Sequence, residues 1–136
     1  MDGGDSPMSD SEPNWPRDLD AVAAAPAHHR VLLENDAVRV LETRIEPGEI
    51  VPLHTHEWPA AYYILAPGEF VRRDERGDVT LDSRAAQQAP RAGQAVWAPP
   101  MGPHTLENVG TTPIHIVSVE VKSRAGALAG VSGAKI

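Results

Sequence analysis

The sequence contains no cysteine among its 136 residues. This absence excludes disulfide bonds, zinc-finger thiolates, iron–sulfur clusters and cysteine nucleophiles. The chain also lacks an uninterrupted apolar run of about 18 residues, so no membrane-spanning helix is expected. It has no basic segment followed by an apolar stretch near its start, so no signal peptide is expected. Together these absences favour a cytoplasmic protein with one folded domain.

Basic residues are few as well. The chain has 12 Lys and Arg against 19 Asp and Glu, a net charge of −7. No basic patch is present that would neutralise phosphates, so nucleic acid is not an expected partner, and neither is a membrane. Six of the acidic residues precede residue 21, where they are accompanied by a single arginine. The acidic character therefore belongs mostly to the N-terminal segment.

The composition divides the chain into three parts. Residues 1–27 are rich in Asp, Ser, Pro, Gly and Ala without sustained periodicity, which predicts a disordered acidic tail. Trp15 is the exception within this tail, because a lone aromatic often docks on a neighbouring surface. Residues 28–122 form the predicted folded domain, and residues 123–136 are predicted to be a flexible C-terminal tail.

Frequent prolines within residues 28–122 leave few gaps long enough for a helix. Between them lie short segments with β-branched or aromatic residues, separated by turn signals such as Pro47-Gly48 and Val109-Gly110. The predicted strands are Val38–Ile45, Ala60–Leu65, Phe70–Arg73, Val79–Asp82, Gln94–Ala98, His104–Asn108 and Ile114–Val121. Regularly spaced short strands predict an all-β sandwich or barrel. A single helical turn is expected within residues 82–89.

Histidines are the most informative side chains. His54 and His56 flank Thr55 in a strand-like context, and residues two apart on a strand point to the same face. His104 follows a proline-rich turn at the start of a later strand, which a barrel can bring opposite this pair. Three neutral imidazoles suit a divalent ion such as iron(II), zinc, nickel, copper or manganese. Taken alone, the pair is also consistent with ordinary hydrogen-bonded histidines.

Two spaced motifs add a resemblance to a known family. Four positions reproduce the spacing of the first cupin motif: Gly48, His54, His56 and Gly68. Four others resemble the second cupin motif: Gly93, Pro99, His104 and Asn108. The resemblance extends from about residue 30 to residue 122. It implies a small cupin β-barrel of the jelly-roll type, with two facing antiparallel sheets and a metal bound by His54, His56 and His104.

The chain departs from the family pattern at one position that matters for chemistry. The first motif normally supplies a glutamate ligand, and the place five residues after His56 holds Ala61. Glu57 and Glu107 are not substitutes, because alternation along a strand turns them away from the neighbouring histidines. A second departure, Met101 in place of a glycine, is a turn variation. The expected site is therefore a three-histidine centre without a carboxylate.

The resemblance implies a range of functions. Cupins without the glutamate include three-histidine iron(II) dioxygenases, and a neutral ligand set leaves the metal with its full charge, which favours a small anionic organic substrate. The chain is also similar to small cupins associated with β-alanine degradation. The leading hypothesis is a metal-dependent dioxygenase, an oxidoreductase. The alternative is a module that binds a metal or a small ligand without turnover, since the fold supports both.

Aromatic residues near the motifs suggest a pocket. If Ala61 points inward, alternation also turns Tyr63 inward, so Tyr63 and Trp97 are the predicted substrate-binding residues. The alternative is that these aromatics fill the core or an interface. His115 is expected to be a hydrogen-bonded histidine rather than a ligand, and His28 and His29 are expected to be solvated.

A homodimer is also expected. An open cupin sheet has an edge and an apolar outer face that a second subunit can cover. The segment Val31-Leu32-Leu33, or the tail with Trp15, is the predicted covering segment.

Overall fold

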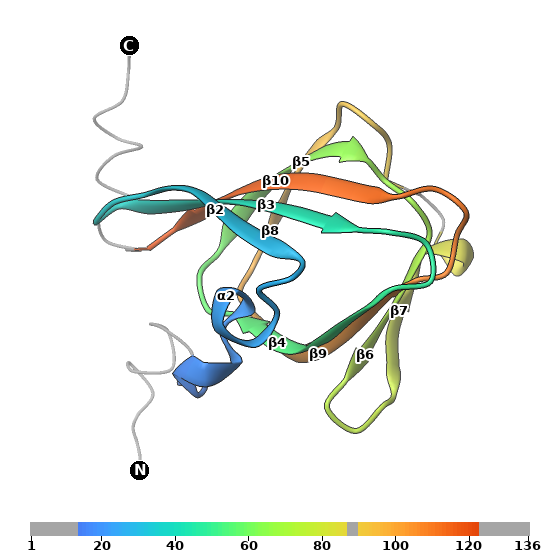
Figure 1. Cartoon of the computed structure of the whole chain (residues 1–136), viewed down its shortest axis with the longest axis horizontal. Coiled ribbons are helices and arrows are strands. Elements are labelled where there is room, and N and C mark those ends of the chain that lie inside the picture. Colours follow the sequence, from blue (N-terminus) through green and yellow to red (C-terminus); the bar gives the residue numbers. More distant parts are fainter. Residues whose placement is uncertain (1–13, 87–89, 123–136) are drawn as a thin grey trace.

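The computed structural model describes residues 14–86 and 90–122, which fold into a barrel of two facing sheets (Figure 1). Its strands are β2 (His29–Glu34), β3 (Val38–Ile45), β4 (Ile50–His56), β5 (Ala60–Ala66), β6 (Phe70–Asp74), β7 (Val79–Asp82), β8 (Ala95–Ala98), β9 (Met101–Asn108) and β10 (Ile114–Val121). The predicted all-β class is confirmed, and the strands predicted at residues 38–45, 79–82 and 114–121 have the predicted bounds.

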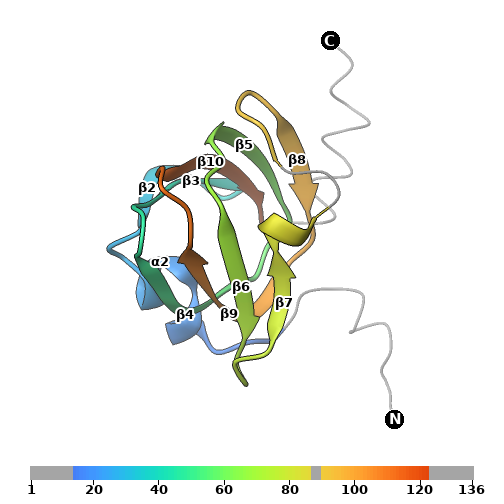
Figure 2. The same cartoon turned by 90° about the vertical axis from the view of Figure 1, so that its right-hand side faces the viewer.

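Every strand pair is antiparallel. One sheet has the order β2-β3-β10-β5-β8 and the other has the order β4-β9-β6-β7. In Figure 2 the β6–β7 hairpin lies next to β9, at one edge of the second sheet. Because β4 and β9 are neighbours, the histidines of the two sequence motifs lie side by side, although His54 and His104 are 50 positions apart in the chain. The predicted jelly-roll arrangement of two facing sheets is therefore confirmed.

Ordered structure begins earlier than the sequence predicted. Residues 14–27 include a 3-10 helix, η1 (Arg17–Leu19), and a short helix, α2 (Ala21–Ala24). Ala21 and Ala25 are fully buried, and Asp20 forms an isolated parallel bridge with Thr55 on β4. The expectation of disorder is wrong for these residues because small alanine side chains and an Asp20 N-cap let the segment pack closely on the barrel. Residues 1–13 and 123–136 lie outside the described residues.

The predicted docking of Trp15 is confirmed. Its ring lies so close to Gly102 that a Cβ atom at residue 102 would be 3.2 Å from the indole. The helical turn expected within residues 82–89 is η2 (Ser83–Ala85), although residues 87–89 lie outside the described part. No helix within the described residues is long and apolar enough to cross a membrane.

Between the sheets lies a hydrophobic cluster. It consists of Ala25, Ile45, Val51 and Ile114, with Phe70, Leu106 and Ile116 packed against it. Asn108 is buried beside it and closes the β9–β10 turn, since its amide donates to the carbonyls of Ile45 and Thr112, each at 2.9 Å. Gly68 has a positive φ of 56°, and a Cβ there would collide with Ile114. These motif residues therefore shape the barrel rather than its chemistry.

Candidate metal centre

The three histidines of the two motifs meet inside the barrel. His54 and His56 lie on β4, and His104 on β9 is the register partner of His54. The ring centroids of His54 and His104 are 4.3 Å apart, and those of His56 and His104 are 5.6 Å apart. All three side chains are at most 6% exposed. The sequence prediction that these imidazoles converge is therefore supported by the geometry, while their role as ligands remains a prediction.

A fourth imidazole belongs to the same cluster. His29, the first residue of β2, lies 5.0 Å from His54 and 5.5 Å from His56 between ring centroids. One ligand nitrogen from each of His29, His54 and His56 lies within 4.8 Å of the others. His29 is 5% exposed, so the expectation that it is solvated is wrong. The apolar run Val31-Leu32-Leu33 is the signal that could have extended the barrel back to His29.

Each imidazole of the cluster is held through Nδ1. Nδ1 of His29 contacts the Ala25 carbonyl at 3.0 Å, and those of His54 and His104 contact the Pro52 and Gly102 carbonyls, both at 2.7 Å. A carbonyl oxygen only accepts, so these Nδ1 atoms carry the proton and donate it. In a neutral ring the lone pair is then on Nε2. Three separate backbone contacts therefore fix the tautomer that presents Nε2 to an ion.

The cluster is electrically neutral at physiological pH. Burial, reinforced by the neighbouring imidazoles, lowers the pKa of His29, His56 and His104 to about 3. Burial also lowers the pKa of His54. A metal ion binds the unprotonated ring, so imidazoles that stay neutral are the form a divalent ion requires.

A buried network of charged side chains contacts His56 through its Nδ1 atom. Nδ1 of His56 lies 3.4 Å from Oε2 of Glu120 on β10, and Oε1 of Glu120 accepts from Nε of Arg39 at 2.6 Å. The two terminal nitrogens of Arg39 each donate to a carboxylate oxygen of Asp20 at 2.9 Å. The Arg39 guanidinium also lies 4.9 Å from the centre of the Trp58 ring. The network thus joins the N-terminal segment, β3, β10 and β4.

Arg39 forms an ion pair with each of the two carboxylates in this network. Burial raises the pKa of Glu120, and the hydrogen bond from Arg39 opposes that rise. Burial would also raise the pKa of Asp20, but the paired guanidinium brings it below its usual range. Because both carboxylates are committed to Arg39, neither is free to serve another cation in the cavity.

The missing glutamate position lies one residue earlier than predicted. Ala60 is 1% exposed and stands opposite Glu120 in the β5–β10 register, whereas Ala61 is exposed. β4 ends at His56 and a three-residue connection precedes β5, so the alternation restarts at Ala60. A shift of one residue turns every side chain of a strand to the other face. The expected inward orientation of Ala61 is therefore wrong.

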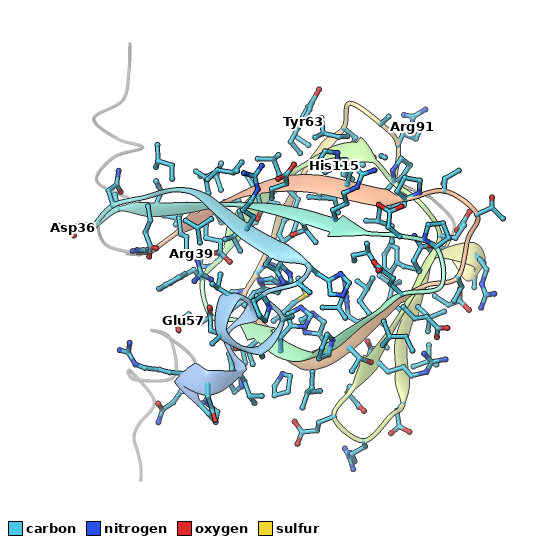
Figure 3. All side chains as sticks on the ribbon, in the orientation of Figure 1. Asp36, Arg39, Glu57, Tyr63, Arg91 and His115 are labelled. Carbon is cyan, nitrogen blue, oxygen red and sulfur yellow. The ribbon has the colours of Figure 1, made fainter. Side chains whose placement is uncertain are left out.

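The same shift moves the predicted pocket aromatics outward. Tyr63 is 47% exposed and Trp97 is 62% exposed, and neither lines the cavity. Figure 3 shows Tyr63 pointing away from the barrel. Tyr62 lines the cavity instead, with its ring centroid 6.4 Å from that of His56, and burial raises its pKa.

The remaining candidates lie outside the cluster. Nε2 of His115 lies 2.7 Å from a carboxylate oxygen of Glu42, which agrees with the prediction of a hydrogen-bonded histidine. Figure 3 places His115 on the far side of the upper sheet from the interior. Glu107 forms an ion pair with Arg73 at 3.1 Å and does not line the cavity.

The histidine cluster opens into a cavity of about 250 Å³ between the sheets. Its walls are mainly apolar, with residues such as Ile64, Phe70 and Leu106. Among the described residues that line it, Arg72 is the single side chain with a full charge at neutral pH. A cavity of this size, close to the lower end of the range for small-molecule pockets of about 300–1,000 Å³, fits a compact ligand.

The donor set fits a divalent transition-metal ion. The group of described residues whose ligand atoms all lie within 4.8 Å of one another is His29, His54 and His56, and the ring of His104 packs against two of them. Neutral imidazoles are borderline ligands, which suit zinc, iron(II), nickel, copper or manganese better than calcium or magnesium. The hydrogen bonds behind them supply the outer support that metal-bound histidines require.

The comparisons with known proteins agree with this architecture. The family model described as cupin domain matches residues 41–120. The chain therefore belongs to the cupin domain family. A cupin domain from Bordetella pertussis Tohama I is similar over 70% of this chain and 92% of its own, at 21% identity and a TM-score of 0.57. A protein with a double-stranded β-helix domain from Klebsiella pneumoniae is similar over 72% and 78%, at 25% identity and a TM-score of 0.50.

A comparison with curated proteins found no match. The solved structures therefore establish the fold of this chain and leave its reaction to the chemistry of the site. His29 precedes the matched range, so the family motifs account for three of the four imidazoles.

Proposed function

We propose that this cupin is a metal-dependent enzyme, a mononuclear iron(II)-type oxygenase that acts on a small anionic organic substrate. His54, His56 and His104 would hold the ion, and His29 lies beside them. The observation that carries the proposal is the meeting of four buried imidazoles whose Nδ1 atoms already have partners. The similarity to small cupins of β-alanine degradation remains a hypothesis about relatives.

The cavity supports metal-centred chemistry over acid–base chemistry. No carboxylate lines it among the described residues, since Glu120 and Asp20 lie behind the histidines and are bound to Arg39. A redox-active ion bound there would supply the electron chemistry through which dioxygen attacks an organic substrate. The apolar walls would bind the substrate and exclude water, and Tyr62 also lines the cavity.

One observation favours the alternative of a non-catalytic metal-binding module. Structural zinc is usually held by four protein ligands, whereas catalytic zinc keeps an open position. If all four imidazoles bind a tetrahedral ion, no position remains for a substrate. His29 therefore separates the two functions: an open site favours an enzyme, and a closed site favours a binding module.

The experiment is metal analysis of protein purified without added metal, followed by oxygen-consumption assays with diketones, thiols and keto acids. We expect about one transition-metal ion per chain and oxygen uptake with an anionic substrate in the iron(II) form. His54→Ala and His104→Ala should lose most of the metal, whereas His115→Ala, on the outer face, should retain it. Full metal content in His104→Ala would contradict the ligand assignment.

His29→Ala tests the alternative directly. Under the enzyme proposal the variant should keep bound metal, because the three proposed ligands, His54, His56 and His104, all remain, and it should still consume oxygen. If the wild type holds tightly bound zinc and no variant or metal form consumes oxygen, the binding module is the correct function.

A further inference from the structure

Arg72 is a half-buried cation that has no carboxylate partner among the described residues. It lies on β6 between its register partners Leu81 and Leu106, and its side chain lines the cavity beside the histidine cluster. Its buried Nε has no hydrogen-bond partner among the residues that the structure describes. The next residue on the strand, Arg73, is by contrast paired with Glu107.

This arrangement is energetically unfavourable for the protein alone. Arginine stays protonated in proteins, and a buried charge without a counter-charge is costly. Burial lowers the pKa of Arg72. The two buried carboxylates of this region, Asp20 and Glu120, are already bound to Arg39. The cavity therefore contains a positive charge that a bound anion can neutralise.

Arg72 is also close to the histidine cluster. Its charge contributes to lowering the pKa of His54, His56 and His104. Its guanidinium carbon lies 6.0 Å from the centre of the Phe70 ring, which provides an apolar surface beside it. An anion bound to Arg72 would thus lie between the imidazoles and an apolar wall.

We propose that Arg72 binds the carboxylate of the substrate, and that the substrate class is a small carboxylic acid with an apolar body. The planar guanidinium matches a carboxylate through two parallel N–H···O hydrogen bonds. The apolar body packs against Ile64, Phe70 and Leu106, and the atoms next to the carboxylate face the histidines. This inference rests on the proposed function in treating the cavity as a substrate site, but it does not depend on which metal is bound.

The test measures binding rather than turnover. Isothermal titration calorimetry compares 3-phenylpropionate, 4-methylpentanoate and 3-phenylpropionamide, on chelator-treated protein and on zinc-loaded protein. The amide has the same body as the first acid but carries no charge. The variants are Arg72→Met, Arg72→Lys and the matched control Arg73→Met, which removes an arginine from the same strand outside the cavity. Unfolding in urea and metal content are measured for each variant.

We expect at least one acid to bind the chelator-treated wild type about tenfold or more tightly than the amide binds. Arg72→Met should lose this preference, Arg72→Lys should retain part of it, and Arg73→Met should retain all of it. Arg72→Met should bind as much zinc as the wild type and should unfold at the same or a higher urea concentration, because the mutation removes an uncompensated buried charge.

Three results would overturn the inference: no preference of the wild type for either acid over the amide, an unchanged preference in Arg72→Met, or an acid preference that exists only with zinc and is independent of residue 72. A preference that depends on Arg72 in a protein that holds no metal would instead support this inference while contradicting the proposed oxygenase. The two failures are therefore distinguishable.

Discussion

Acid should destabilise the metal-free protein because the buried histidines cannot accept protons while it is folded. The pKa of His29, His56 and His104 is about 3 in the fold, against about 6.5 for an exposed imidazole. The folded pKa values are lowered, so their stabilising contribution is complete above pH 6.5. It declines as the pH falls from 6.5 toward 3, because the unfolded chain binds the protons first.

The magnitude follows from the span of pH. Each proton taken up on unfolding changes the free energy of unfolding by about 1.4 kcal/mol per pH unit. Between pH 6.5 and pH 5, one histidine therefore contributes about 2 kcal/mol and three contribute about 6 kcal/mol. The raised pKa of Glu120 acts in the opposite direction, since the fold takes up that proton more readily than the unfolded chain. A loss of several kcal/mol is a large part of a total stability of about 5–15 kcal/mol.

The assay is urea unfolding of chelator-treated protein, monitored by tryptophan fluorescence. It is repeated at intervals of half a pH unit from pH 7.5 to pH 5. His104→Gln should reduce the slope of the free energy of unfolding against pH by about 1.4 kcal/mol per pH unit, because one fewer proton is taken up on unfolding. A wild-type stability that is flat between pH 6.5 and pH 5 would refute the reasoning, because it would mean that the imidazoles protonate without unfolding.

Three further outcomes are expected. Asp20→Ala removes the acceptor of both terminal nitrogens of Arg39 and should lower the free energy of unfolding by about 3 kcal/mol in urea titrations, because two buried N–H groups of a charged side chain lose their partner; an effect below 1 kcal/mol would show that the network contributes little. Ala60→Glu places a second carboxylate opposite Glu120 and should destabilise the metal-free protein in thermal melts, whereas Ala61→Glu on the outer face should not; equal effects would contradict the register. Light scattering at micromolar concentration should give the mass of two chains, since the outer face exposes Tyr63, Trp97 and Val119, and Trp97→Asp should give the mass of one; a wild-type monomer would reject the dimer.

Strands that show a clear local pattern of residue types were predicted correctly from the sequence. Prolines and β-branched runs place β3, β7 and β10 with the correct bounds, and the spacing of His54 and His56 places both rings inside the barrel. The β2 strand was missed because only His29 is buried along it, and its other residues are exposed, so no alternation marks it. A strand whose role is to deliver one side chain carries little periodic signal.

The register of β5 and the pairing of buried charges could not be predicted from one sequence. Whether Ala60 or Ala61 faces inward depends on the length of the connection after His56, and one residue decides the orientation of Tyr62 and Tyr63. The pairing of Arg39 with Glu120 joins residues 81 positions apart, and nothing in either neighbourhood marks it. The absence of a carboxylate partner for Arg72 among the described residues likewise becomes visible only in the folded structure.

The N-terminal segment matters for the choice of fragments in which this protein can be studied. A fragment cut at the limits of the family match, residues 41–120, would retain both motifs and most of the barrel strands. It would nevertheless lose the imidazole of His29 and both Asp20 and Arg39, leaving the carboxylate of Glu120 buried without its counter-ion. An expression fragment designed on the homologous region alone would carry a recognisable motif and an incomplete centre, so its inactivity would say nothing about the whole chain.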